Sequence, residues 1–286
     1  MTALMEAAQL ADVLAAHDCR IFDMRGEKAY SQGHVAGAVN VPRATLFSTA
    51  YPYACMRLDS DALQRMLRAL GVNKDQTLVL YDDRANYDSC RFWWLLAVYG
   101  FRNVMIIDGG IDALLEASVS LVSEPPSYAE GDFAFDASVS RQDWLSDHVE
   151  LQSVVSEKRD TASVLLDVRL PAEFNGQECV AGASYAGRLP NAKWLDFHDT
   201  VDKQNANRFK SKAALLALCE QVGLNPSQTI HCYCHAGIRS AHTLFALTQI
   251  LGFPHVTNYD GSWIEWSYLG LPYESEGLPQ DEVADV

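Results

Sequence analysis

LGVNKDQTLVLYD at residues 70–82 and VGLNPSQTIHCYC at residues 222–234 align without a gap, 152 positions apart. The same spacing continues downstream of both stretches. Further matching pairs are GF at 100–101 and 252–253, and DGG at 108–110 opposite DGS at 260–262. A spacing that persists over so many positions is typical of an internal repeat. The chain is therefore predicted to contain two copies of one folding unit.

The repeat also defines a domain organisation. Upstream, FDMR at 22–25 resembles LDVR at 166–169, and GHVAGA resembles GRLPNA, with small changes of offset that loop insertions would cause. We expect a first domain at 1–122, a linker rich in proline, serine and acidic residues at 123–142, a second domain at 143–275, and an acidic tail at 276–286.

Each copy alternates short runs of β-forming residues with amphipathic helical patterns, which predicts an α/β fold with a mainly parallel sheet and helices on both faces. The predicted strands are 20–23, 77–82, 103–108, 163–168, 229–234 and 255–260. Ligands of such sheets bind beyond the carboxyl ends of the strands. A strand ending at Tyr233, followed by a loop and a helix starting near Ser240, occupies that position.

Composition limits the possible functions. The net charge of -15 and the pI of about 4.8 disfavour binding to nucleic acid. Residues 1–18 read as an amphipathic helix rather than a signal peptide, and no apolar stretch approaches the length of a membrane span. The seven cysteines are scattered and odd in number. We therefore expect a cytoplasmic, reduced protein without membrane or nucleic-acid partners.

The gapless alignment distinguishes the two copies. It places Asp82 opposite Cys234 and Tyr87 opposite Arg239. The first copy thus lacks the thiol and the cation, so any chemistry of this loop belongs to the second copy. Because a buried, unpaired carboxylate is costly, the exchange of Asp for Cys predicts that this position is partly exposed.

The stretch HCYCHAGIRSAH at 231–242 admits several kinds of chemistry. A metal site would need His231 and Cys232 on one face, which strand alternation prevents, and a second ligand pair is missing. A redox pair needs C-x-x-C, whereas this is C-x-C. A phosphatase loop needs five residues between cysteine and arginine, but four separate Cys234 from Arg239. A loop one residue shorter suits a sulfur atom better than a phosphoryl group.

The chain resembles the two-domain rhodaneses, a family of sulfurtransferases. The resemblance is carried by the D-x-R of each half (Asp23 with Arg25, and Asp167 with Arg169), by GHVAGA, by CHAGIR at 234–239 and by YDGSWIEW at 259–266. It spans almost the whole chain. It implies two tandem rhodanese-like domains, of which the first is catalytically silent and the second carries the nucleophile.

The resemblance implies that Cys234 is the catalytic nucleophile and passes through a persulfide. The backbone N–H groups of the loop would form a cradle for the sulfur, and Gly237 would allow the turn. The cradle residues are His235, Ala236, Gly237, Ile238, Arg239 and Ser240. Arg239 and the helix dipole would favour the thiolate, and Ser240 would cap the helix. No cofactor and no metal are required.

Other residues carry two interpretations. Arg188, where the first copy has histidine, is either a second contact for the anionic donor or an ion-pair partner. Trp263 is either a packing residue or a wall of the pocket. Cys232 is either a core residue or a resolving thiol. The two D-x-R motifs are expected to form structural ion pairs.

The donor and the acceptor are less closely defined. In the family that the chain resembles, members that prefer 3-mercaptopyruvate tend to carry a loop like CG-x-G-x-T and arginines after the second D-x-R. Here the loop ends in Arg239, and Glu173 and Asn175 follow the second D-x-R. This difference favours thiosulfate, a small dianion that suits a cationic pocket. The expected partners are thus a small anionic sulfur donor and a thiol or cyanide acceptor. The alternatives are a 3-mercaptopyruvate sulfurtransferase and a persulfide carrier that delivers sulfur to a protein.

Overall fold

The structure is a computed structural model that describes residues 3–156 and 162–276. Contacts within the chain divide it into two compact units, and each unit is described separately below. The first unit comprises Met1–Ser48, Arg57–Gln142 and Val201–Lys210, and the second comprises Thr49–Met56, Asp143–Thr200 and Ser211–Val286. Except for Glu276, the predicted acidic tail lies outside the described residues. Within the described ranges, every helix is too short or too polar to cross a lipid bilayer.

The first unit contains a five-stranded parallel sheet in the order β1-β6-β5-β2-β4. The strands are β1 (Leu4–Met5), β2 (Cys19–Asp23), β4 (Ala38–Asn40), β5 (Thr77–Tyr81) and β6 (Val104–Ile107). A short antiparallel pair joins β3 (His34–Val35) to β7 (Leu121–Val122). The central strand β5 is buried along its whole length, as expected for a strand covered on both faces.

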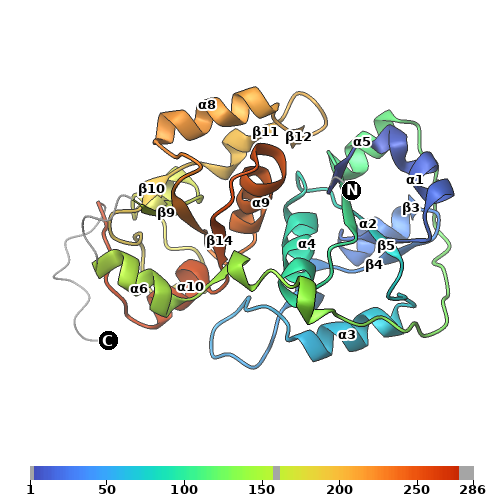
Figure 1. Cartoon of the computed structure of the whole chain (residues 1–286), viewed down its shortest axis with the longest axis horizontal. Helices are drawn as coiled ribbons and strands as arrows, with labels where there is room; N and C mark the ends of the chain where they lie inside the picture. The colour runs from blue at the N-terminus through green and yellow to red at the C-terminus, as the bar shows by residue number, and fades with distance from the viewer. Residues whose placement is uncertain (1–2, 157–161, 277–286) are drawn as a thin grey trace. The chain divides into compact units, whose positions relative to one another are not determined.

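Helices cover both faces of this sheet, as Figure 1 shows. Helices α1 (Leu10–Ala16) and α5 (Gly110–Glu116) pack on one face through a cluster that includes Leu10, Ile21 and Leu114. Helices α3 (Ser60–Ala69) and α4 (Tyr87–Tyr99) cover the other, where the ring of Phe92 meets that of Phe22 edge to face. The short α2 (Glu27–Gln32) and the 3₁₀ segments Ala7–Gln9 and Arg43–Leu46 complete the unit.

The second unit repeats this sheet. Its strands lie in the order β10-β9-β13-β14-β8, all parallel, which matches the order in the first unit strand for strand. They are β8 (Leu145–Ser146), β9 (Ser163–Asp167), β10 (Lys193–Trp194), β13 (Thr229–Tyr233) and β14 (Val256–Tyr259). The predicted repeat and the mainly parallel α/β fold are therefore confirmed.

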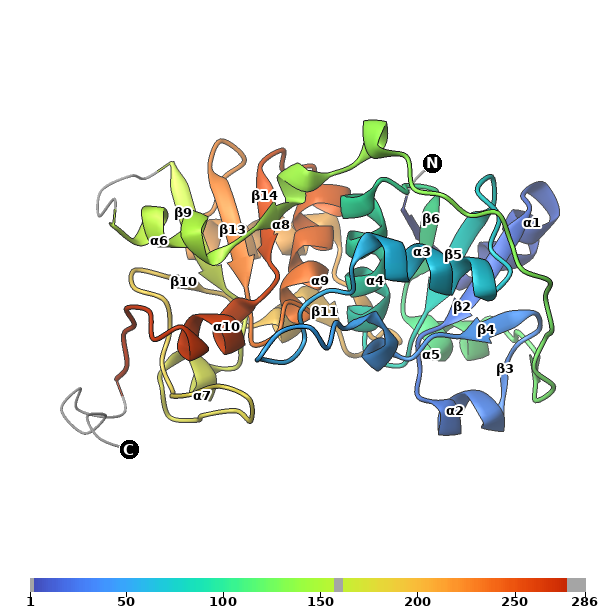
Figure 2. The same cartoon turned by 90° about the horizontal axis from the view of Figure 1, so that it is seen from below.

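Helices also cover both faces of the second sheet, and Figure 2 shows the same elements from below. One face carries α6 (His148–Ser156) and α10 (Ser262–Tyr268), where Leu151, Trp263 and Trp266 form the core with Leu165. The other carries α8 (Lys212–Val222) and α9 (Arg239–Phe245), which continues as a π-helical turn at Ala246–Leu251. Short elements are α7 (Pro171–Phe174) and the 3₁₀ segments Gln142–Trp144 and Phe197–Thr200.

Two segments differ in detail from the expectation. The predicted helix over 1–18 is wrong at its start, because Leu4 and Met5 instead pair with Ile106 and Ile107 as the edge strand β1. The predicted linker 123–142 contains the 3₁₀ turn Ala137–Val139 and the first residue of the 3₁₀ segment Gln142–Trp144, and its Phe133 is fully buried in the first unit. A short antiparallel pair, β11 (Val201–Asp202) with β12 (Arg208–Phe209), also belongs to that unit.

Candidate active site

The loop that follows β13 lies at the carboxyl end of the second sheet. Strand β13 ends at Tyr233, as predicted, and α9 begins at Arg239, one residue before the expected start. Its neighbour β9 ends beside it, with Asp167 in register with Tyr233. Residues 234–238 thus occupy the edge where parallel α/β sheets bind their ligands.

Cys234 is buried, with 1% of its surface exposed, so the prediction of a partly exposed position is wrong. The same holds for Asp82 in the first unit. The Asp82 carboxylate is not unpaired, however. Its oxygens accept hydrogen bonds from the backbone N–H groups of Arg84, Asn86 and Ser89 at 2.8, 3.0 and 2.9 Å. Because these donors replace water, either side chain can be buried at the end of its strand.

The surroundings of Cys234 favour its thiolate. Burial raises the pKa of Cys234, but the positive charge of Arg239, the hydroxyl of Ser240 and the backbone N–H groups of Ser240 and Ala236 outweigh it. The pKa of Cys234 is therefore lowered from its ordinary value of 9.0. The Ser240 hydroxyl donates to Sγ at 3.4 Å. A cysteine with a lowered pKa is the reactive kind.

The expected helix cap is wrong. The residue that precedes α9 is Ile238, whose side chain cannot cap, and the hydroxyl of Ser240 lies one residue inside the helix. From there it donates to Cys234 Sγ instead of accepting from the backbone. The loop thereby gives up a side-chain cap and gains a hydrogen bond to Cys234 Sγ.

Gly237 shapes the loop, and two side chains hold its peptide groups. Its φ of 71° lies in the left-handed region, where glycine is favoured. Its N–H donates to Ser262 Oγ at 3.0 Å, and its carbonyl accepts from Asn258 Nδ2 at 3.1 Å. The Gly237 N–H is therefore directed to Ser262, although the sequence placed it in the sulfur cradle.

Ser262 links this loop to the start of α10. Its hydroxyl accepts from the backbone N–H of Cys234 at 3.2 Å and donates to the carbonyl of Tyr259 at 2.7 Å. It adopts a φ of 50°, an unfavourable backbone conformation for a serine. The matching residue of the first unit is Gly110, with a φ of 54°. The serine thus adopts a glycine conformation, and its hydroxyl holds the backbone at the end of β13.

Arg239 is engaged by a carboxylate that the sequence did not assign to the site. Its two terminal nitrogens donate to Glu173 Oε2 and Oε1 at 2.6 and 2.8 Å. Glu173 lies on α7 and is 2% exposed, whereas the Arg239 side chain is 18% exposed. Burial raises the pKa of Glu173, but Arg239 outweighs it, and the pKa is lowered from 4.5. The pair holds the guanidinium in one orientation with part of it open to solvent.

Arg188 contacts the C-terminal segment of the second unit. Its guanidinium forms ion pairs with Glu274 and Glu276, at 3.3 and 3.0 Å, and lies over the ring of Phe174. The backbones of Arg188 and Glu274 also exchange hydrogen bonds. The structure thus shows the ion-pair interpretation of Arg188, and its contact with a donor stays a prediction.

The remaining marked residues, Trp263 and Cys232 in the core and His235 at its margin, belong to the second unit. Trp263 is 1% exposed, and its indole N–H donates to the carbonyl of Tyr185 at 2.9 Å. Cys232 is fully buried in β13, and burial raises the pKa of its thiol, which fits a core residue. His235 contacts the Ala181 carbonyl through Nε2 at 3.0 Å. Among the described residues, no cluster of three His, Cys, Asp or Glu side chains has a geometry able to hold a metal ion.

The D-x-R motifs form the expected ion pairs. Arg25 pairs with Asp23, and Arg169 pairs with Asp167, each at 2.6 Å with the carboxylates fully buried. Each arginine also donates to a backbone carbonyl, that of Gly33 or Gly187. The two pairs therefore anchor matching loops at the carboxyl edge of each sheet.

Three residues of the site were missed or only touched upon: Glu173, Ser262 and Asn258. The repeat holds a signal for Ser262, because DGS stands opposite DGG and a serine replaces a glycine of left-handed conformation. Glu173 follows a strand that ends at the same edge of the sheet as the loop. This position predicts that Glu173 lies near the loop, but it does not identify Arg239 as its partner. Asn258 is an amide inside a buried strand, where a polar side chain needs a partner.

Comparisons with known proteins agree with this geometry. The rhodanese-like domain matches twice, at residues 6–117 and 143–268. A protein of Thermus thermophilus named sulfur carrier protein TtuD is 31% identical over 85% of this chain and 86% of its own. A thiosulfate sulfurtransferase of Corynebacterium glutamicum is 31% identical over 86% of this chain and 81% of its own.

Solved structures show the same fold at lower identity. The wild-type structure of EanB has a TM-score of 0.83 and 21% identity, covering 97% of this chain and 70% of that one. At this identity the likeness concerns the fold alone. The two family matches together cover most of the sequence, on either side of the segment 118–142. The chain belongs to the rhodanese-like family and carries two copies of its domain.

Proposed function

We propose that the protein is a sulfurtransferase that moves the outer sulfur of thiosulfate to a thiophilic acceptor through a persulfide on Cys234. The observation that carries this proposal is the buried sulfur of Cys234, whose pKa is lowered by Arg239, by Ser240 and by backbone N–H groups. Such surroundings stabilise a thiolate and equally suit the terminal sulfur anion of a persulfide.

The reaction divides into two balanced steps. The Cys234 thiolate attacks the outer sulfur of thiosulfate, an S–S bond to the enzyme forms, and the S–S bond of the donor breaks with release of sulfite. An acceptor such as cyanide then attacks the terminal sulfur of the persulfide, leaves as thiocyanate, and the thiolate returns. No electron carrier and no metal take part, and the enzyme alternates between two covalent states.

Arg239 supports an anionic donor, in spite of its bond to Glu173. Glu173 is almost completely buried, whereas Arg239 is partly exposed, so the carboxylate holds the guanidinium from the protein side. A guanidinium has five N–H donors, and the two hydrogen bonds to Glu173 leave others available. The exposed part of Arg239 is thus suited to contact the oxygen atoms of thiosulfate.

The test is a two-step assay. The protein is incubated with thiosulfate, its intact mass is measured, and cyanide is then added. We expect a mass increase of one sulfur atom, its loss on addition of cyanide, and formation of thiocyanate. The Cys234→Ser variant should show none of these, while Cys179→Ser, which removes an exposed cysteine elsewhere in the same unit, should behave as the wild type. Absence of the adduct with both thiosulfate and 3-mercaptopyruvate would overturn the proposal.

The pH dependence of the first step supplies a second readout. Because the pKa of Cys234 is lowered from 9.0, the thiolate is present at a lower pH than in an ordinary cysteine. The rate of adduct formation should therefore rise with pH and reach its plateau before pH 9.0. A rate that still increases steeply above that pH would mean that the loop does not stabilise the thiolate.

A persulfide carrier is the second candidate, supported by the similarity to the sulfur carrier protein of Thermus thermophilus. In that role the Cys234 adduct would form readily but react slowly with small acceptors. The ratio of adduct formation to thiocyanate release in the same assay separates the two candidates, and parallel runs with 3-mercaptopyruvate establish the preferred donor.

A further inference from the structure

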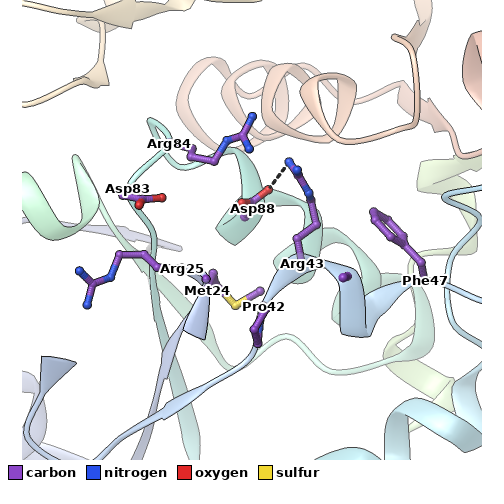
Figure 3. A pocket seen from close by; sticks show the side chains of 10 residues that line it. Met24, Arg25, Pro42, Arg43, Phe47, Asp83, Arg84 and Asp88 are labelled. Carbon is purple, nitrogen blue, oxygen red and sulfur yellow. Dashed lines mark hydrogen bonds and ion pairs between the residues drawn. The ribbon is translucent and has the colours of Figure 1, made fainter. Parts of the chain in front are cut away.

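The silent first unit contains a pocket of its own, with a volume of about 560 Å³. Figure 3 shows its lining, which comes from three loops at the carboxyl edge of the first sheet. The lining residues are Met24, Arg25, Gly26, Pro42, Arg43, Ala44, Phe47, Asp83, Arg84 and Asp88. In the repeat, Asp83, Arg84 and Asp88 correspond to His235, Ala236 and Ser240 of the catalytic loop. The pocket therefore occupies the position of an active site.

This pocket cannot carry out the chemistry of the second unit. The nest of backbone N–H groups beneath it is filled by the carboxylate of Asp82. That carboxylate is buried and belongs to the chain itself, so the nest is unavailable to an incoming anion. A ligand must instead interact with the side chains that line the space above.

The lining charges are not all neutralised. Arg43 bonds to Asp88 at 3.1 Å, and Arg25 bonds to Asp23 and to the Gly33 carbonyl. Asp83 and Arg84 are both exposed, and within the described part of the chain neither side chain forms an ion pair or a hydrogen bond. The pocket thus presents one available cation and one available anion.

Each of these charges has a distinct neighbourhood. Burial and the Asp82 carboxylate raise the pKa of Asp88 to about 6, and the nearby guanidiniums of Arg43 and Arg84 oppose this rise. Asp83 acts on Arg25, which already bonds to Asp23, so two carboxylates flank one guanidinium. The exposed side chains of Arg84 and Asp83 therefore remain the charged groups that a ligand can reach in this pocket. Across the pocket from Asp83 lies the ring of Phe47, with Met24 and Pro42 adding apolar surface.

We propose that this pocket binds a zwitterionic α-amino acid with an apolar side chain. The carboxylate of the ligand would bond to Arg84 and the edge of Arg43, because a guanidinium matches a carboxylate with two parallel hydrogen bonds. The ammonium group would face Asp83, and the side chain would pack on Phe47, Met24 and Pro42. The volume lies within the range of small-molecule sites and far exceeds that of a simple oxoanion.

The experiment compares three probes that differ only in charge: L-phenylalanine, 3-phenylpropionate without the ammonium group, and 2-phenylethylamine without the carboxylate. Binding of each to the full chain is measured by isothermal titration calorimetry. We expect L-phenylalanine to bind at least about tenfold more tightly than either analogue, since each charged hydrogen bond contributes about that much.

Variants assign each charge to its residue. Arg84→Ala should weaken L-phenylalanine and 3-phenylpropionate by about tenfold and leave 2-phenylethylamine unchanged. Asp83→Asn should do the reverse, weakening only the two probes that carry an ammonium group. Arg102→Ala, which removes an exposed arginine of the same unit outside the pocket, should change nothing.

Two results would overturn the proposal. One is the absence of saturable binding of L-phenylalanine at millimolar concentration. The other is equal binding of L-phenylalanine and 3-phenylpropionate together with no effect of Asp83→Asn, which would describe a plain carboxylate site. Neither result bears on the Cys234 persulfide, whose assay uses a different unit of the chain.

Discussion

The environment of Cys234 contains groups that shift the pKa of its thiol in opposite directions. Burial alone raises the pKa of a thiol, as at Cys232 two residues earlier on the same strand. At Cys234 a cation, a hydroxyl and two backbone N–H groups reverse that effect. Both cysteines are buried, so hydrogen bonding and charge, not burial, account for the opposite shifts of their pKa values.

The Arg239–Glu173 pair leads to the first prediction. Arg239→Ala leaves the nearly buried carboxylate of Glu173 without its counter-ion, so the free energy of unfolding should fall by about 3 kcal/mol. Glu173→Gln in the Arg239→Ala background removes the unpaired charge and should recover part of that loss. Urea denaturation of the single and double variants measures both effects.

The pH dependence of the same pair has a definite sign. The pKa of Glu173 is lowered in the folded state from an ordinary value of 4.5. The stabilisation by the ionised carboxylate is therefore complete above pH 4.5 and is lost as the pH falls through the lower folded-state pKa. The stability difference between wild type and Arg239→Ala should shrink in that acidic range. A difference that stays constant as the carboxylate protonates would contradict the ion-pair explanation.

At the scale of elements, the start of α10 holds the loop that follows β13. Ser262 precedes Trp263, whose backbone N–H donates to the Cys234 carbonyl at 3.0 Å. The Ser262 hydroxyl accepts hydrogen bonds from the backbone N–H groups of Cys234 and Gly237. Asn258 on β14 adds a bond to the Gly237 carbonyl. The loop after β13 is thus held by the neighbouring strand and the helix that follows that strand.

Substitutions of Ser262 give the second prediction. Ser262→Ala leaves two backbone N–H groups without their acceptor and keeps the unfavourable φ, so the free energy of unfolding should fall by about 2 kcal/mol. Ser262→Gly loses the same hydrogen bonds but relieves the backbone strain. Its free energy of unfolding should therefore fall by about 1 kcal/mol less than that of Ser262→Ala. Both should slow alkylation of Cys234 by iodoacetamide. Wild-type alkylation in Ser262→Gly would show that the hydroxyl has no influence on the loop.

At the scale of the whole molecule, the two copies solve one problem in two ways. Each ends its central strand in a nest of backbone N–H groups, occupied by the Asp82 carboxylate in the first unit and by the Cys234 sulfur in the second. The nest is thus a property of the repeated fold. The occupant of the nest is what differs between the two units.

Asp82 accordingly gives the third prediction. Asp82→Ala should lower the free energy of unfolding by about 3 kcal/mol, because three buried N–H groups lose their acceptor. Asp82→Asn should be milder, since its amide oxygen can accept from Arg84 and Asn86 in place of Oδ1. Burial raises the pKa of Asp82, so loss of the charge itself is not costly. Thermal or urea unfolding checks the order, and an equal loss in both variants would contradict it.

The sequence by itself determined the repeat, the succession of strands and helices along the chain, the parallel α/β architecture and the position of Cys234 at the end of a strand. These follow from patterns within short stretches and from their recurrence 152 residues apart. The start of the first helix was wrong because pairing with Ile106 and Ile107, far along the chain, overrides the local helical pattern.

Only the tertiary structure decided which partners complete the site. Glu173 reaches Arg239 across 66 residues, and Ser262 reaches Cys234 across 28, and nothing in the local sequence specifies either contact. The same holds for burial: whether Asp82 and Cys234 are exposed depends on the N–H groups that the folded loop turns toward them. Local periodicity predicts elements, whereas hydrogen-bond partners and charge neighbours arise when distant strand ends meet at one edge of a sheet.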